Sequence, residues 1–131
     1  MRILLDTHDF LWLIVAPSKL SRAFCDLIKT PSNEIYLSVI SLLEITIKYR
    51  LGNLPLSETP EILIPKQRQA HRITSLILDE GAIFEVGKLP SIDRDPFDRL
   101  LIGQALQHDL RLATVDPDIF RYPVFLIDPR L

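Results

Sequence analysis

A helix with a buried face carries an unexpected carboxylate in the stretch RDPFDRLLIGQAL, residues 94–106. Asp95 precedes a proline and is expected to cap this helix, which is a common position for an acid. Asp98 falls near the middle of the apolar arc, where a solvated carboxylate is not expected. That arc comprises Leu101, Ile102, Ala105 and Leu106, and Arg99, Gly103 and Gln107 lie opposite. Asp98 is therefore either the third-position acid of a capping box or part of an active site.

Glu44 presents the same anomaly in the stretch SVISLLEITIKYRLG, where a helix is expected over residues 39–51 and Gly52 ends it. Residues at helical spacing form an apolar stripe that comprises Ile40, Leu43, Ile47 and Leu51. Glu44 lies beside this stripe. The alternative role for Glu44 is an i,i+4 ion pair with Lys48, worth only a few tenths of a kcal/mol.

Two further acids follow expected strands. Asp6 ends the strand RILLD, and Asp116 ends the strand LATVD. Because ligands gather at the carboxyl ends of strands in open α/β sheets, the two carboxylates meet if both strands are central. Each acid also has a simpler role, since Asp6 can cap the next helix and Asp116 can begin an Asp-Pro turn.

Four acids close together indicate a cation. Burying several carboxylates is costly without one, because like charges repel at low dielectric. Oxygen ligands alone favour a hard ion such as Mg²⁺ or Mn²⁺. The histidines His8, His71 and His108 show no ligand spacing, so a zinc site is not expected. His8 can still approach the mouth of the site as a hydrogen-bond donor to a ligand.

The remaining pattern alternates strands with helices and predicts an α/β sandwich with a mostly parallel sheet. Strands are expected at residues 2–6, 34–38, 82–86, 112–116 and 123–127. Helices are expected at residues 9–15, 18–29, 39–51, 67–80 and 96–108. Pro55, Pro60 and Pro65 predict a loop with one short helical turn.

The composition is that of one ordinary globular domain of 131 residues, with 47% hydrophobic and 24% charged residues. The formal net charge of −2 gives no bulk basic signal, so nucleic-acid binding requires a local patch or metal ions. The single cysteine, Cys25, excludes an internal disulfide. Acids interrupt the apolar N-terminus, and the run at residues 10–16 is too short for a membrane span. We therefore expect a cytoplasmic protein without a membrane partner.

Four stretches together resemble the PIN-domain ribonucleases, specifically the VapC-like toxins of toxin-antitoxin modules. These stretches are LLDTHDFLW, SVISLLEITIK, RDPFDRLLIGQAL and LATVDPDIFRYPV, and the resemblance covers essentially the whole chain as a single PIN domain, residues 1–131. It implies a three-layer α/β/α sandwich with about five strands. The acidic quartet of the family falls on Asp6, Glu44, Asp98 and Asp116. Thr7 and Thr114 match supporting residues, and Asp118 matches an acid that lies near the site in some members.

The resemblance also implies a reaction: hydrolysis of RNA phosphodiester bonds, assisted by Mg²⁺ or Mn²⁺, which leaves 5′-phosphate and 3′-hydroxyl ends. The RNA class remains open among tRNA, rRNA and mRNA. Candidate contacts to RNA phosphates are Lys48, Arg94, Arg99 and the basic run at residues 66–72, each of which is alternatively a solvated surface charge. The expected partners are a small cognate antitoxin, whose C-terminal segment blocks the acidic site, and a second copy in a homodimer.

Two positions depart from the family pattern without touching a ligand: Asp93 stands where histidine is frequent, and Leu43 where an aromatic residue often precedes the glutamate. Three other functions fit parts of the same sequence. A phosphatase with Asp6 as nucleophile requires a second acid at position 8, which is a histidine. A PIN-fold module that binds RNA or protein without turnover, and a housekeeping RNA-processing nuclease, both remain alternatives.

Overall fold

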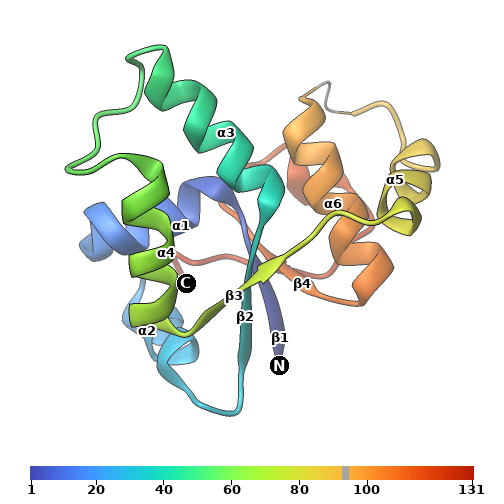
Figure 1. The fold of residues 1–131 in the computed structure, drawn as a ribbon. Helices are drawn as coiled ribbons and strands as arrows, with labels where there is room; N and C mark the ends of the chain where they lie inside the picture. The colour runs from blue at the N-terminus through green and yellow to red at the C-terminus, as the bar shows by residue number, and fades with distance from the viewer. Residues whose placement is uncertain (93–94) are drawn as a thin grey trace.

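The computed structural model of the chain describes residues 1–92 and 95–131. Its centre is a sheet of five parallel strands in the order β3-β2-β1-β4-β5 (Figure 1). The strands are β1 (Arg2–Leu5), β2 (Glu34–Ser38), β3 (Ile73–Leu76), β4 (Arg111–Ala113) and β5 (Leu126–Ile127). The predicted α/β fold with a mostly parallel sheet of about five strands is confirmed.

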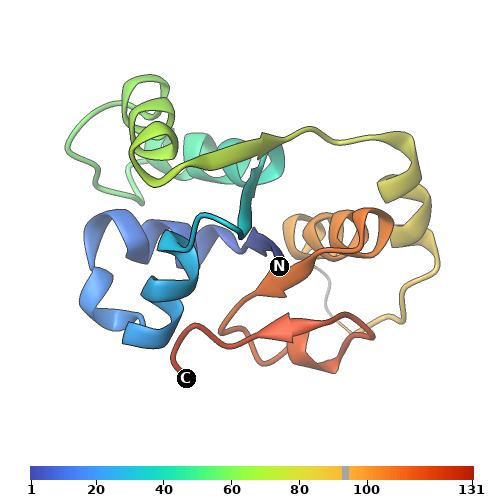
Figure 2. The same ribbon diagram turned by 90° about the horizontal axis from the view of Figure 1, so that it is seen from below.

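Helices cover both faces of this sheet, so the fold has three layers (Figures 1 and 2). The helices are α1 (Thr7–Val15), α2 (Arg22–Lys29), α3 (Val39–Arg50), α4 (Pro60–His71), α5 (Glu80–Gly87) and α6 (Pro96–His108), with short 3₁₀ turns at Pro17–Lys19 and Ile119–Arg121. In both views α1, α2 and α4 lie on one side of the sheet and α5 and α6 on the other.

The central strand β1 shows why the layers form. Successive side chains of a strand point to opposite faces, so Ile3 and Leu5 pack with α1, α2 and α4, whereas Leu4 packs with α6. All three are fully buried. A parallel strand covered on both faces is expected to be continuously apolar, and the sequence ILL satisfies this requirement.

The middle of the chain differs from the prediction. The loop expected around the three prolines and the helix expected at 67–80 are wrong, because α4 spans Pro60–His71 and β3 follows it at Ile73–Leu76. Pro60 occupies the first helical position, where proline is well tolerated, and Pro65 lies inside the same helix. The helix ends where Arg72 adopts a left-handed backbone conformation with φ 56°.

The strand expected at residues 82–86 is also wrong, because this segment belongs to helix α5. The side chain of Asp79 caps the helix by accepting a hydrogen bond of 2.9 Å from the backbone N–H of Ala82. Gly81 therefore lies in the first turn of a helix instead of ending one. The apolar run AIFEV is as typical of a short buried helix as of a strand.

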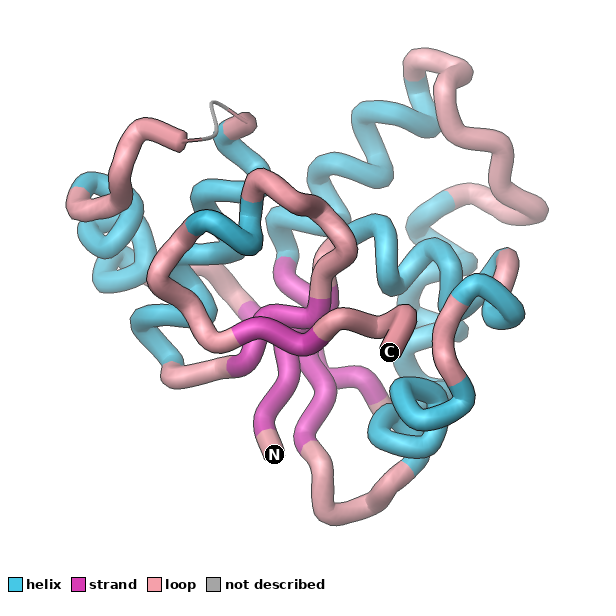
Figure 3. Tube along the Cα trace, turned by 180° about the vertical axis from the view of Figure 1, so that it is seen from behind, coloured by secondary structure: helices cyan, strands magenta, loops and turns pink. Residues whose placement is uncertain are grey.

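The sheet topology places β1 and β4 at the point where the strand order reverses. From β1 the chain proceeds to β2 and β3 on one side, and from β3 it crosses to β4 and β5 on the other. Crevices outside the carboxyl ends of strands at such a switch point bind ligands in open α/β sheets. After β5 the chain ends beside the start of α2 (Figure 3), where the Ser21 N–H donates to the Pro129 carbonyl at 2.8 Å.

None of the helices in the described part of the chain is long and apolar enough to cross a membrane.

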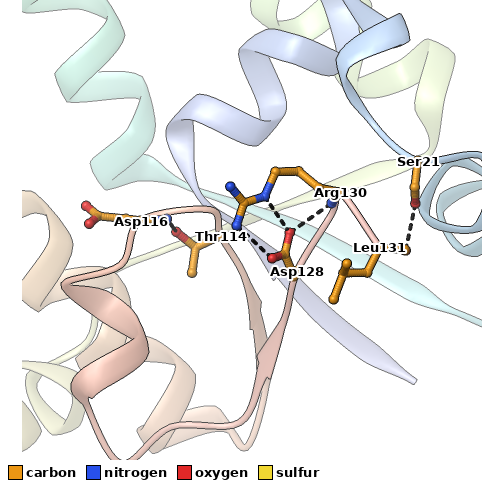
Figure 4. Close-up of polar contacts among 6 residues, drawn as sticks. All are labelled: Ser21, Thr114, Asp116, Asp128, Arg130 and Leu131. Atoms are coloured by element: carbon orange, nitrogen blue, oxygen red, sulfur yellow. Dashed lines mark hydrogen bonds and ion pairs between the residues drawn. The ribbon is translucent and has the colours of Figure 1, made fainter.

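One buried acid on α1 lies outside the predicted quartet. Asp9 is fully buried, and neither carboxylate oxygen has a hydrogen-bond partner among the described residues. Burial, followed by repulsion from Asp6 and Asp128, raises the pKa of Asp9 to about 9, although Arg130 opposes the shift. Arg130 is itself held by Asp128 through two hydrogen bonds of 3.0 and 2.8 Å (Figure 4). Asp9 is therefore protonated at neutral pH in the folded chain.

Replacing Asp9 by Asn is expected to change how stability depends on pH. The folded-state pKa of Asp9 lies above its ordinary value of 3.8, so the contribution of Asp9 is fully present below pH 3.8 and is lost as pH rises toward 9. Asp9→Asn should leave the free energy of unfolding of the metal-free protein unchanged near pH 4 and raise it at pH 7 by on the order of a few kcal/mol.

Urea denaturation in chelator between pH 4 and 9 measures this difference. The matched control is Asp26→Asn on the exposed side of α2, which should keep the wild-type pH dependence. Identical pH dependence in wild type and Asp9→Asn would contradict the assignment.

Candidate active site

A cavity of about 630 Å³ opens at the carboxyl ends of β1 and β4. Three segments form it: the start of α1, the exposed side of α3 with the loop after it, and the start of α6 facing the loop after β4. Its described lining residues are Asp6, Thr7, His8, Leu11, Glu44, Lys48, Asn53, Leu54, Asp95, Asp98, Val115, Asp116 and Pro117. The structure therefore brings all four acids of the predicted quartet to one cavity.

Asp6 lies directly after β1, where the chain turns into α1. It occupies the N-cap position, but its side chain makes no capping hydrogen bond. Instead, one carboxylate oxygen accepts a hydrogen bond of 2.7 Å from the hydroxyl of Thr114. Burial is the main cause that raises the pKa of Asp6, and the charges of Glu44 and Asp116 add to it. The Asp6 side chain therefore lines the cavity and does not cap α1.

Thr114 links Asp6, which follows β1, to Asp116, which lies in the loop after β4 and does not end the strand as predicted, because β4 stops at Ala113. Its buried hydroxyl donates to Asp6 and accepts a hydrogen bond of 3.1 Å from the backbone N–H of Asp116 (Figure 4). The Asp116 carboxylate in turn accepts a hydrogen bond of 2.9 Å from the N–H of Asp118. This bond forms the turn that the Asp-Pro sequence predicts. Asp118 is exposed and does not line the cavity, so its contact with the site is the hydrogen bond from its backbone N–H to Asp116.

Glu44 projects from the second turn of α3, which starts immediately after β2. The predicted ion pair is present, with Lys48 Nζ donating to Glu44 Oε2 at 2.7 Å, and this contact raises the pKa of Lys48. Both residues nevertheless line the cavity. The apolar stripe predicted beside Glu44 is only partly a core face, since Leu43, Ile47 and Leu51 are exposed and only Ile40 is buried.

Two acids, Asp95 and Asp98, stand at the start of α6. Asp95 caps the helix by accepting a hydrogen bond of 2.9 Å from the N–H of Phe97, which confirms the prediction. Asp98, one turn later, lines the cavity together with Asp95. The expectation that Gly103 lies on a face opposite the core is wrong, because Gly103 is buried against α5.

A buried amide that sequence reasoning missed fixes α6 relative to the sheet. Gln104 is fully buried, accepts a hydrogen bond from the hydroxyl of Ser38 and donates one of 3.1 Å to the carbonyl of Ile77. Ser38 ends β2 and caps α3, and Ile77 follows β3. The network thus joins the helix of Asp98 to the strand that precedes Glu44. A glutamine among apolar helix positions is the one signal that predicts it.

The remaining predicted residues divide between the cavity and other places. Thr7 lines the cavity, and its hydroxyl donates a hydrogen bond of 2.8 Å to the hydroxyl of Ser41. This bond joins α1 to α3. Among the described residues that were predicted to contact RNA phosphates, Lys48 lines the cavity. Arg99 does not line it, because its guanidinium donates to the carbonyls of Pro90 and Val86 at 2.9 and 3.1 Å. Arg94, like Asp93, lies outside the described residues.

The charge of the lining favours a cation. Five carboxylates face one ammonium group among the described lining residues, and their mutual repulsion already contributes to the raised pKa of Asp6. Within residues 1–92 and 95–131, no three acid, histidine or cysteine side chains stand close enough together to enclose a metal ion. The donor set itself, which is carboxylate oxygen, suits Mg²⁺ or Mn²⁺. A cation bound in the cavity would offset the repulsion among these carboxylates.

The sequence matches the PIN domain family over residues 3–124. The chain belongs to the PIN domain family. A comparison with curated proteins found no significant match. The predicted membership of this family is thus confirmed.

Solved structures with the same fold come from toxin-antitoxin complexes. A chain of VapBC2 from Rickettsia felis, bound to a DNA fragment from the promoter, superposes with a TM-score of 0.75 at 20% identity, covering 97% of this chain and 98% of that one. A chain of VapBC-1 from nontypeable Haemophilus influenzae superposes with a TM-score of 0.70 at 20% sequence identity, and the match covers 98% of each chain. A chain of DNA-bound VapBC from Salmonella typhimurium superposes with a TM-score of 0.70 at 22% sequence identity, and the match covers 98% of this chain and 97% of that one. At these identities the PIN domain shares the fold of these chains over their whole length.

Proposed function

We propose that this PIN domain, a single unit over residues 1–131, is a metal-dependent endoribonuclease that acts in the cytoplasm as the toxin of a toxin-antitoxin module. The observation that carries the proposal is the convergence of Asp6, Glu44, Asp98 and Asp116 on one cavity at the switch point of the sheet. Similarity to chains of VapBC complexes supports the toxin role.

The quartet would hold one or two Mg²⁺ or Mn²⁺ ions. When bound, such an ion lowers the pKa of a water for in-line attack and neutralises charge on the phosphate. The Thr114 hydroxyl keeps the Asp6 carboxylate turned toward the cavity. Asp98 lies in the first turn of α6, where the positive end of the helix dipole favours its ionised form. Lys48 provides a cation for an RNA phosphate at the same cavity.

The surface beside the site supports a protein partner. Leu43 and Ile47 on α3 and Leu51 at its C-cap recur every fourth residue and are 50%, 41% and 69% exposed. This apolar stripe runs next to Glu44 and Lys48, which line the cavity. A small antitoxin that packs on the stripe would bring a basic side chain to the carboxylates, and opposite charges favour that contact. The stripe equally supports a homodimer, in which a second copy covers it.

Expression without an antitoxin is expected to arrest growth and to generate RNA fragments with new 5′-phosphate ends. Glu44→Gln should relieve both effects, because it removes one carboxylate ligand without changing the size of the side chain. Growth curves and sequencing of RNA 5′ ends in the same cultures measure the two effects together. Coexpression of a short reading frame adjacent to the gene should restore growth if it encodes the antitoxin.

The outcomes separate the alternatives. Harmless expression with RNA fragments present would favour a housekeeping nuclease. Harmless expression without fragments would favour a PIN-fold binding module, and growth arrest that persists in Glu44→Gln would contradict the assignment of Glu44.

A further inference from the structure

Three side chains in mutual contact lead from the cavity along α1. His8, on the first turn of α1, is exposed and lines the cavity. Its ring meets the ring of Trp12, one turn later, edge to face, with centroids 4.5 Å apart and planes at 69°. The Lys19 ammonium, in the 3₁₀ turn after α1, lies 5.5 Å from the centroid of the Trp12 ring. These three residues form the α1 row, and of the three only His8 is among the described lining residues.

Trp12 anchors the α1 row. It is half-buried and packs against the hydrophobic core on the α1 side of the sheet. His8 and Lys19 are both exposed, and each contacts this anchored ring. A cation within about 6 Å of an indole centroid is attracted by the negative face of the ring. The row is therefore formed before any ligand binds.

The charge of Lys19 is not neutralised by a neighbouring acid. Three other lysines each pair with a glutamate, namely Lys48, Lys66 and Lys88. Across residues 1–92 and 95–131, by contrast, no carboxylate lies within ion-pair distance of the Lys19 ammonium. The acid of α1, Asp9, is fully buried and protonated at neutral pH. A contact with a ring face leaves the ammonium N–H groups available to an anion.

We propose that the α1 row binds a nucleotide of the RNA strand beside the phosphodiester that is cleaved, with the base on the His8 and Trp12 rings and a phosphate at Lys19. The inference rests on the proposed ribonuclease function and adds a binding subsite to it. Proteins hold nucleic-acid strands with aromatic rings, on which bases stack, and with cations that contact phosphates. Every base has a face that can stack, so the row contributes affinity without a base preference.

The combination of rings and charge favours a nucleotide as the occupant. The carboxylates of the cavity repel a phosphate unless metal ions intervene. Lys19 is not among the described lining residues and offers a permanent cation to another phosphate of the same strand. A strand that passes His8 therefore meets aromatic surface and positive charge together. An apolar peptide side chain would use the rings but not the ammonium, whereas a nucleotide uses both.

Trp12 is the only tryptophan of the chain, so its fluorescence reports on the α1 row. Titration with octauridine in Ca²⁺, an ion that carboxylates also hold, should quench this fluorescence, because a base stacked on an indole quenches its emission. His8→Ala should weaken octauridine binding about fivefold through the loss of a stacking ring. Because His8 is exposed, this variant should keep the wild-type melting temperature.

The salt dependence of octauridine binding, at constant Ca²⁺, tests the phosphate contact. Lys19→Gln should lower the slope of log K against log salt concentration by about 0.7, the value for one phosphate contact in a single strand. The matched control is Lys29→Gln at the end of α2, another exposed lysine without an ion pair in the described part of the chain. This control should retain the wild-type slope and the wild-type quenching.

Cleavage measured on the same protein in Mg²⁺ separates this inference from the proposed function. Quenching that depends on His8 and Lys19, in a protein that cleaves no RNA, would support the subsite and contradict turnover. Cleavage by a protein whose Trp12 fluorescence does not respond to RNA would overturn the subsite and leave the nuclease intact. An unchanged salt slope in Lys19→Gln would overturn the phosphate contact. Octauridine that binds without quenching would overturn the nucleotide site and leave the row to a protein partner.

Discussion

Replacing Asp98 by Asn will reduce RNA cleavage in Mg²⁺ or Mn²⁺ by about 100-fold or more, because a metal ion contributes several kcal/mol to the transition state and each 1.4 kcal/mol is a factor of ten. Asp98 lies at the start of α6 and lines the cavity with the three other acids. Asn keeps the size of the side chain but removes its charge. Initial rates with labelled RNA, with and without added metal, measure the loss.

Asp6→Asn should reduce cleavage to a similar extent, but it should stabilise the metal-free protein. In the metal-free chain, burial and the charges of Glu44 and Asp116 raise the pKa of Asp6, so its ionised form is unfavourable there. Removing that charge should raise the melting temperature in chelator. The same change removes a metal ligand, so the rise in melting temperature on adding Mn²⁺ should shrink.

Asp109→Asn is the matched control, since Asp109 is exposed at the opposite end of α6 from Asp98. Its cleavage rate and its response to Mn²⁺ should equal those of wild type. Undiminished cleavage by either Asp6→Asn or Asp98→Asn would contradict the quartet. A wild-type melting temperature that does not respond to Mn²⁺ or Mg²⁺ would contradict the metal site itself.

The ends of the chain were predictable because several local signals agree there. At β1 a short apolar run stops at an acid, and in α6 an Asp-Pro cap precedes a long apolar pattern. In α3 the helix was predicted, but its buried face was not. Ile45 is fully buried, whereas Leu43 and Ile47 are exposed. Spacing predicts that a stripe exists, and only the tertiary fold decides which stripe meets the core.

The middle of the chain was not predictable because single residues there admit two roles. Pro65 suggested a break but lies inside α4, and Gly81 suggested a helix end but lies at the beginning of α5. Capping by Asp79 decides the second case, and this bond depends on where the preceding strand stops. The pattern of an eight-residue apolar segment cannot distinguish a short helix from a strand.

The site shows the same division. The carboxylates were recognisable from the sequence as a set, because two were expected after strands and two beside apolar helix positions, and the resemblance to PIN domains falls on the same four acids. Arg99 was not distinguishable from an RNA contact, because a basic residue on a helix gives no sign that its guanidinium will bind loop carbonyls. Asn53 gave no signal either. The turn after α3 brings it to the cavity.

Gly103→Ala should destabilise the protein by about 1–3 kcal/mol, the usual cost of overpacking a tight contact. A Cβ at position 103 would lie 2.5 Å from the carbonyl oxygen of Ala82 and 2.8 Å from Val86 Cγ2 on α5. The carbonyl belongs to the backbone of α5, so it cannot move aside as a flexible side chain would. Alanine improves helix propensity by about 0.5–1 kcal/mol, and this gain is too small to offset the clash.

Gly87→Ala provides the matched control, because a Cβ at that position would meet nothing within 4 Å. Gly87 ends α5, the partner helix in the same contact. The same substitution there should be neutral or stabilising by about 0.5 kcal/mol. Urea denaturation of both variants measures the difference, and equal stabilities would contradict a close approach of α5 and α6.

The effect of Gly103→Ala should extend to the site, because α6 carries both Gly103 and Asp98. If α6 shifts away from α5, the Asp98 carboxylate moves relative to Asp6 and Asp116. The rise in melting temperature on adding Mn²⁺ should therefore be smaller in Gly103→Ala than in Gly87→Ala. A full metal response in a destabilised Gly103→Ala would show that Ser38 and Ile77, through Gln104, hold α6 in place without help from α5.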